Sequence, residues 1–177
     1  MKRGRRTLSA AERARVPEVL GLAEELTAEH FQLPSFDESS FTYDVLTLKD
    51  LGPEEIDDQA LAVLHRYARE DRESSPHSFF RICLQDHNLL AALSREQDIA
   101  FDDLLLFVLT HELVHIVRFA RFLQIFHAPE DERLAEERAV HDTTRQILAR
   151  LRSDTLERIL ARWEDSGPDV IRDGTES

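Results

Sequence analysis

Residues 101–123, FDDLLLFVLTHELVHIVRFARFL, decide how this chain is expected to fold. Apolar side chains occupy almost every side of a helix written on this stretch, and such a helix is usually buried at the centre of a protein. Acidic residues, histidines and arginines interrupt the apolar run. Because each ion left in hydrocarbon would cost at least about 2.5 kcal/mol, the stretch is predicted to be a central core helix rather than a membrane span.

The two histidines of this stretch, His111 and His115, lie four residues apart. Residues at this spacing share one face of a helix about one turn apart, so both imidazole rings can reach one metal ion. Glu112 completes the pattern HExxH, in which two imidazoles hold Zn²⁺ and the glutamate acts as a general base. We therefore expect one zinc ion held by His111 and His115, with Glu112 as the catalytic residue.

A third ligand is expected from residues 132–142, ERLAEERAVHD, because catalytic zinc sites generally combine three protein ligands with one open position. At about 100° per residue, Glu137 and His141 fall inside the apolar face of the helix predicted there. Burying a carboxylate and an imidazole without partners is costly, and a metal would satisfy both. The structural alternative is that they pair with Arg118 or Arg121 of the central helix.

The choice between Glu137 and His141 depends on where the central helix ends. If it runs unbroken to the next turn, an antiparallel partner helix places His141 level with His115, and Glu137 roughly 9 Å lower. Glu137 comes within reach only if the central helix ends or bends near Arg121. A site with Glu137 alone keeps an open position and is catalytic, whereas a site with both residues is closed and structural or regulatory.

The rest of the chain predicts a single, predominantly helical α+β domain over residues 9–165. A small sheet, with strands near 41–48 and 79–84, is expected to pack on the buried central helix. The other helices are predicted over about 10–30, 53–72, 88–93, 131–151 and 153–163, the first of them opened by a capping box at Ser9 and Glu12. The basic tip 1–8 and the polar tail 166–177 are predicted to be disordered.

Composition narrows the possible partners. The formal net charge of -13 argues against general affinity for nucleic acid or for anionic membranes. The single cysteine, Cys83, excludes an internal disulfide framework and is typical of a reducing, cytoplasmic setting. The composition indicates no oligomeric state.

HELVH on a buried helix, followed after 21 residues by Glu137 on the next helix, resembles the gluzincin class of zinc metallopeptidases. The run Glu136-Glu137-Arg138-Ala139 leading to Ile147-Leu148 is similar to the second-helix glutamate segment of the small intracellular ImmA/IrrE-like group. The resemblance covers about residues 79–150. It implies that His111, His115 and Glu137 are zinc ligands, that Glu112 is the base, and that the substrate is a peptide or protein.

The chain departs from this resemblance at two places. His141 stands where thermolysin-like enzymes carry an aspartate four residues after the ligand glutamate, and no Tyr or His oxyanion donor can be assigned. In such enzymes a strand before the active-site helix aligns an extended substrate, and residues 79–84 occupy the matching place, although they also fit an ordinary core strand. Asp86 and His87 follow that strand and could approach the cleft or simply form its polar end.

Three functions are therefore open. The first is a zinc-dependent metallopeptidase in which Glu112 takes a proton from a water molecule. The second is a non-catalytic metal sensor or regulatory protein with a closed site of His111, His115, Glu137 and His141. The third is a di-iron helical protein, because Glu112-Leu-Val-His115 also matches the Glu-x-x-His motif of carboxylate-bridged bundles, but the chain has no second such motif.

Overall fold

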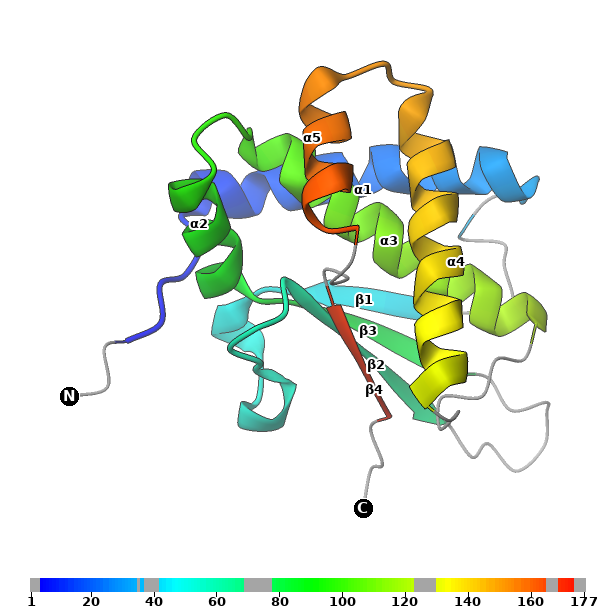
Figure 1. The fold of residues 1–177 in the computed structure, drawn as a ribbon. Coiled ribbons are helices and arrows are strands. Elements are labelled where there is room, and N and C mark those ends of the chain that lie inside the picture. The colour runs from blue at the N-terminus through cyan, green and yellow to red at the C-terminus, as the bar shows by residue number, and fades with distance from the viewer. Residues whose placement is uncertain are drawn as a thin grey trace.

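The computed structural model describes residues 4–34, 36, 42–68, 78–122, 130–164 and 169–173. It confirms a predominantly helical α+β fold, in which helices stand over a small sheet (Figure 1). The helices are α1 (Ala10–Phe31), α2 (Asp86–Arg95), α3 (Phe101–Phe122), α4 (Glu130–Ala149) and α5 (Asp154–Arg162), and the strands are β1 (Thr42–Leu46), β2 (Ala62–Ala68), β3 (Ser78–Leu84) and β4 (Asp169–Asp173).

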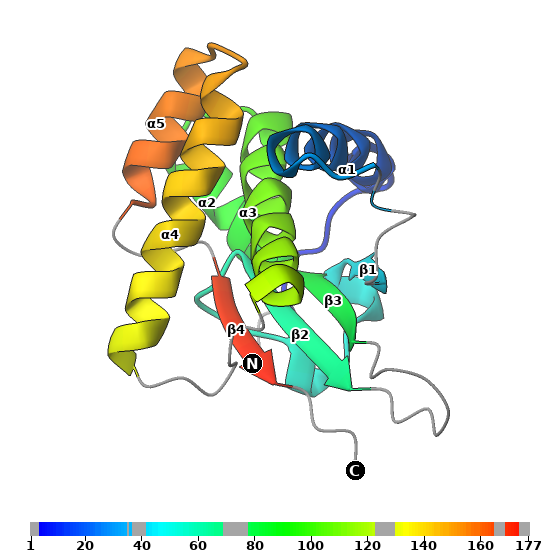
Figure 2. The same ribbon diagram turned by 90° about the vertical axis from the view of Figure 1, so that its right-hand side faces the viewer.

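Helix α3 is the centre of the molecule, as its apolar sequence predicts. Every residue from Leu104 to Val117 is buried. Figure 2 shows why: α1 lies along one side of α3, α4 and α5 lie along the other side, and the sheet lies beneath it. In the described part of the chain, no helix combines the length and the apolar character needed to cross a membrane.

The sheet has four strands in the order β1-β3-β2-β4. β3 pairs in parallel with β1 and antiparallel with β2, and β4 pairs in parallel with the other edge of β2. Side chains alternate between the two faces of a strand, and Phe80, Ile82 and Leu84 of β3 join the same apolar cluster as α3. Cys83 belongs to a smaller cluster with Ala60 and Val63.

The prediction of a helix over residues 53–72 is wrong. Pro53–Glu55 forms a single 3₁₀ turn, and the chain then enters strand β2. The residues from Ala62 to His65 are all buried, because β2 is covered on both faces. A strand buried on both faces gives a continuous apolar run that periodicity cannot separate from a buried helix, and here the long-range pairing with β3 decides the outcome.

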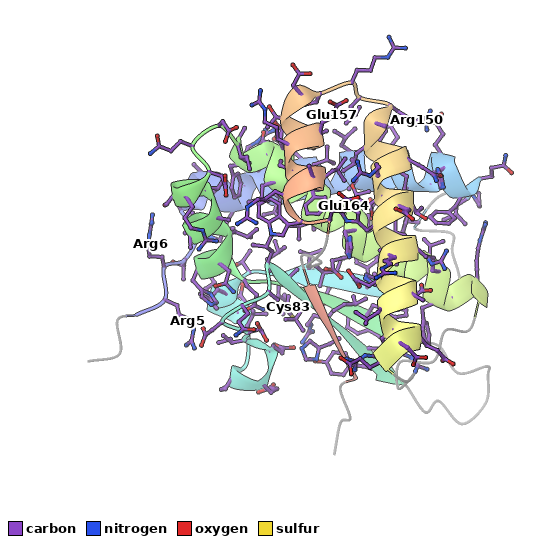
Figure 3. The ribbon with its side chains drawn as sticks, in the orientation of Figure 1. Arg5, Arg6, Cys83, Arg150, Glu157 and Glu164 are labelled. Atoms are coloured by element: carbon purple, nitrogen blue, oxygen red, sulfur yellow. The ribbon has the colours of Figure 1, made fainter. Side chains whose placement is uncertain are left out.

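Described residues of both segments that the sequence predicts to be disordered, 1–8 and 166–177, contact the body of the domain. Leu8 is only 1% exposed, and Arg5, labelled in Figure 3, pairs with Asp58 at 2.8 Å from Nε to Oδ1. At the other end, residues 169–173 form β4. Contacts of this kind depend on distant parts of the chain, so local composition does not reveal them.

Asp86 joins three segments from a buried position at the start of α2. Its Oδ2 accepts a hydrogen bond from the backbone N–H of Leu8 at 2.8 Å, and its Oδ1 accepts one from Leu48 at 2.9 Å. Buried N–H groups need such partners. Asp86 therefore holds the N-terminal segment and the turn after β1 in place, while the neighbouring His87 faces Asp58 at 3.1 Å.

We expect Asp86→Ala to lower the free energy of unfolding by about 2 to 5 kcal/mol, because it leaves two buried donors without an acceptor. Urea denaturation followed by circular dichroism measures this loss. Asp50→Ala, at an exposed site in the same region, is the control and should change stability by less than about 0.5 kcal/mol. Equal stability of the two variants would contradict the role given to Asp86.

Candidate metal centre

The ring nitrogens of two histidines on α3 form one side of the candidate site. His111 and His115 lie one helical turn apart, and their Nε2 atoms are 3.2 Å from each other. The side chains are 0% and 4% exposed, respectively. The burial of α3 on all sides thus holds both imidazoles in a nearly water-free position, aimed at one point.

Glu137 of α4 brings a carboxylate to the same point. Its Oε1 lies 2.8 Å from Nε2 of His111, and its Oε2 lies 3.1 Å from Nε2 of His115. The Glu137 side chain is 28% exposed, so the site reaches solvent on the side of α4. In the described part of the chain, these three residues form a group whose ligand atoms all lie within 4.8 Å of one another.

An ion pair between α3 and α4 lies next to this site. Arg118 binds Glu136 in a bidentate manner, with Nε–Oε1 and Nη2–Oε2 distances of 2.7 and 3.0 Å. This contact aligns α4 so that the following residue, Glu137, lies level with the histidines. Arg121 donates to the carbonyl of Phe31 at 2.8 Å. Arg118, which the sequence offers as a partner for Glu137, thus binds the neighbouring Glu136.

Glu137 lies level with the two histidines. Helix α3 is described as far as Phe122, immediately after Arg121, and α4 begins at Glu130. The sequence predicts that Glu137 reaches the histidines only if the central helix ends or bends near Arg121, and the residues that follow Phe122 lie outside the described part of the chain. The alternative in which Glu137 lies roughly 9 Å below His115 is not adopted.

His141 lies close to the site but outside the group. It is one turn beyond Glu137 on α4 and 4% exposed, and its ring centroid is 6.5 Å from that of His111. The Phe107 ring packs edge-on against it at 6.2 Å. Neither ring nitrogen of His141 has a hydrogen-bond partner among the residues that the structure describes. Burial, and then the charge of His111, lower the pKa of His141, which favours its neutral form.

Glu112 is fully buried beside the two histidines. Helical geometry turns its side chain by about 100° from that of His111. It lies outside the group of three ligand atoms. Glu112 is therefore adjacent to the candidate metal position without being one of the converging ligands.

The donor set fits a divalent metal ion such as zinc. Two imidazole nitrogens and one carboxylate oxygen are donors that Zn²⁺ accepts, usually at about 2.0 to 2.2 Å in a tetrahedral arrangement. Ligands at such distances lie about 3.3 Å apart. The observed separations of 2.8, 3.1 and 3.2 Å are close to this value. Three protein ligands leave the fourth position of a tetrahedral ion for a water molecule or a substrate.

Strand β3 cannot align a substrate by strand addition, which is the role considered for residues 79–84. Its backbone is paired on both sides, since Ile82 lies opposite Val45 of β1 and opposite Leu64 of β2. A substrate strand needs an unpaired edge. The structure therefore supports the other interpretation, an ordinary core strand.

Two contributors to the site were not predicted. Phe107 packs beside His111 and His141, at ring distances of 6.0 and 6.2 Å. It lies four residues before His111, so the spacing that joins the histidines also places Phe107 on their face. The pair of Arg118 with Glu136 has a weaker signal in the sequence, namely that Glu136 lies at the edge of the apolar face of its helix.

Comparison of the chain with protein-family models, curated proteins and solved structures gives no match. The resemblance to gluzincins therefore stays a prediction from the motif. The geometry of His111, His115 and Glu137 is the basis on which function is argued below.

We expect one zinc ion to bind per chain. The substitution Glu137→Gln should weaken the zinc affinity by at least about 100-fold, which is more than the loss of an outer-shell partner usually costs. The amide keeps the size of the side chain but removes the negative charge that the ion requires. Isothermal titration calorimetry with ZnCl₂ measures the affinity. A thermal shift gives an independent readout, because a bound ligand stabilises the folded state.

Glu136→Gln is the matched control, one residue away on the same helix. It weakens the ion pair with Arg118 and leaves the ligand set intact, so its loss of zinc affinity should be about tenfold or less. Equal losses of zinc affinity in the two variants would show that Glu137 is not a metal ligand.

Proposed function

We propose that this protein is a zinc-dependent hydrolase that cleaves peptide bonds. The convergence of His111, His115 and Glu137 from two helices, directly beside Glu112, carries the proposal. Three protein ligands with one remaining position are typical of catalytic rather than structural zinc sites. The substrate is a peptide or protein, and a reducing, cytoplasmic setting is part of the proposal because the single cysteine, Cys83, is free and buried.

Zn²⁺, when bound by these residues, lowers the pKa of water and polarises a carbonyl oxygen. Glu112 then serves as the general base that accepts a proton from the attacking water and as the acid that passes it to the leaving amine. Its burial keeps bulk water away from the carboxylate. Electrostatic interactions are stronger in such a low-dielectric position than in solvent.

The exposed fractions of the three ligand side chains support access of a substrate to the site from one side. His111 and His115 are buried, whereas 28% of the Glu137 side chain is exposed. A substrate carbonyl can therefore approach past Glu137 without disturbing the apolar packing of α3. The two histidines stay anchored in the core during this approach.

A second candidate is a closed metal site that includes His141 and has no catalytic role. The observation that favours it is the burial of His141 with both ring nitrogens lacking a hydrogen-bond partner in the described residues. A buried polar group without a partner is costly, and coordination would remove that cost. In this candidate, the His141 ring moves toward His111 and fills the fourth position. A di-iron site is less well supported, because the group contains only one carboxylate.

We expect Glu112→Gln to retain zinc affinity within about threefold while lowering hydrolysis by at least about 100-fold, the contribution typical of a general base. Fluorescently labelled, denatured casein is the probe for hydrolysis. Glu132→Gln, at an exposed position on α4, is the control and should hydrolyse casein at the unaltered rate. Hydrolysis that survives in Glu112→Gln would overturn the assigned role.

His141→Phe separates the two candidates. An open site with three ligands should lose less than about threefold in zinc affinity, whereas a closed site should lose at least about 100-fold, as for any direct ligand. Titration with ZnCl₂ measures this difference. His30→Phe, on α1 and outside the ligand group, controls for the general effect of replacing an imidazole.

A further inference from the structure

Helix α4 consists of two halves that are held to the body of the domain in different ways. The second half, residues 140–149, carries the buried residues of the helix, namely Val140, His141, Thr144, Ile147 and Leu148. In the first half, residues 130–139, no residue is buried, and Leu134 is 55% exposed. The packing that removes α4 from solvent is therefore confined to the second half.

The first half meets α3 through charged and polar side chains. Glu136 binds Arg118, and Glu137 lies at 2.8 and 3.1 Å from the Nε2 atoms of His111 and His115, respectively. These contacts lie close to the junction of the two halves, and the part of the helix before them is exposed throughout. Figures 1 and 2 show this N-terminal end of α4, drawn in yellow, extending past α3 to the level of the sheet. Among the described residues, the fastening of the first half is thus concentrated at Glu136 and Glu137.

A helical segment of this length is not stable by itself. Isolated helices shorter than about 12–15 residues are marginal in water, and the first half is shorter than that. The acidic side chains of Glu130, Asp131 and Glu132 favour the helix through its dipole, but this effect acts along the helix and does not attach it to α3. Segments with few buried apolar contacts open at low free-energy cost. The docked position of the first half therefore depends on the polar contacts of Glu136 and Glu137.

We propose that residues 130–139 form a metal-dependent flap, which Glu137 fastens to α3 when it shares an ion with His111 and His115. Coordination by all three residues is possible only while the flap is docked, so a bound ion stabilises the docked state. Loss of the ion leaves the flap held by its polar contacts with α3 and lets it detach.

Detachment of the flap would change access to the site. The Glu137 side chain is already 28% exposed, whereas Glu112 is fully buried. Moving Glu137 and the turn around it away from α3 would open the buried histidines to solvent. The metal content of the protein would thus regulate the site. Such regulation rests on the ligand set of the proposed function but does not require hydrolysis.

Hydrogen exchange of the full-length chain tests whether the flap detaches. The first four N–H groups of a helix have no partner within it, so the amides of residues 134–139 report on the flap. In protein freed of metal with EDTA, they should exchange at least about tenfold faster than the amides of residues 144–149, because only the flap has to open. ZnCl₂ at about 100 times its Kd should slow their exchange at least about tenfold, within the roughly 100-fold shift that linkage allows.

Equal exchange of the two sets of amides in metal-free protein would mean that α4 opens as one unit, and would overturn the proposal. The flap is also overturned if calorimetry shows bound zinc while its amides stay unprotected, a result that leaves the hydrolase proposal standing. Protection of the flap by zinc without hydrolysis of casein would keep the flap and remove the hydrolase. A chain that binds no zinc overturns both.

A nitroxide label gives a second measurement, at one position of the flap. The label is attached to Leu134→Cys, and the matched control is Gln146→Cys at an exposed position of the second half, each combined with Cys83→Ala so that one thiol remains. Zinc should lengthen the rotational correlation time of the label at position 134 by at least about twofold and leave that at position 146 unchanged, because docking slows nanosecond motion of the flap alone. When Glu137→Gln is added, the same zinc concentration should leave the label on the flap mobile. Equal responses at the two positions, or a response that survives Glu137→Gln, would contradict the fastening of the flap by Glu137.

Discussion

The structure depends on the burial of polar side chains at the middle of its most apolar helix. His111, Glu112 and His115 are each at most 5% exposed, inside a helix that is covered on every side. Polar groups in such a position need partners. Glu137 supplies one to both histidines, and it comes from another helix. The position of α4 relative to α3 is therefore the geometric quantity on which the candidate site depends.

Several contacts fix that position. Arg118 and Glu136 form a bidentate pair immediately beside the site, and the Phe107 ring packs against both His111 and His141. The side of α3 away from α4 is covered by α1. A core packed in this way resists small shifts. The carboxylate of Glu137 is thereby held at hydrogen-bond distance from two imidazoles before any ion is considered.

The features that the sequence predicts correctly are local ones. The capping box of Ser9 and Glu12, the central helix and the spacing of His111 and His115 all depend on residues within a few positions of one another. Strand β2 and the attachment of β4 depend instead on pairing across the sheet. The choice between Glu137 and His141 needed the axial offset of two helices, which helical periodicity does not contain. Long-range contacts explain each difference between expectation and structure.

The division of the ligands between two helices also connects metal binding with folding. His111 and His115 are adjacent on α3 in any state where that helix forms, but Glu137 joins them only when α4 has packed. A metal held by all three would consequently stabilise the packed state over any state in which α4 is detached. Residues Glu130–Ala149 form α4, which stands on the same side of the molecule as β4 (Figure 2). The metal centre and the packing of α4 thus depend on each other.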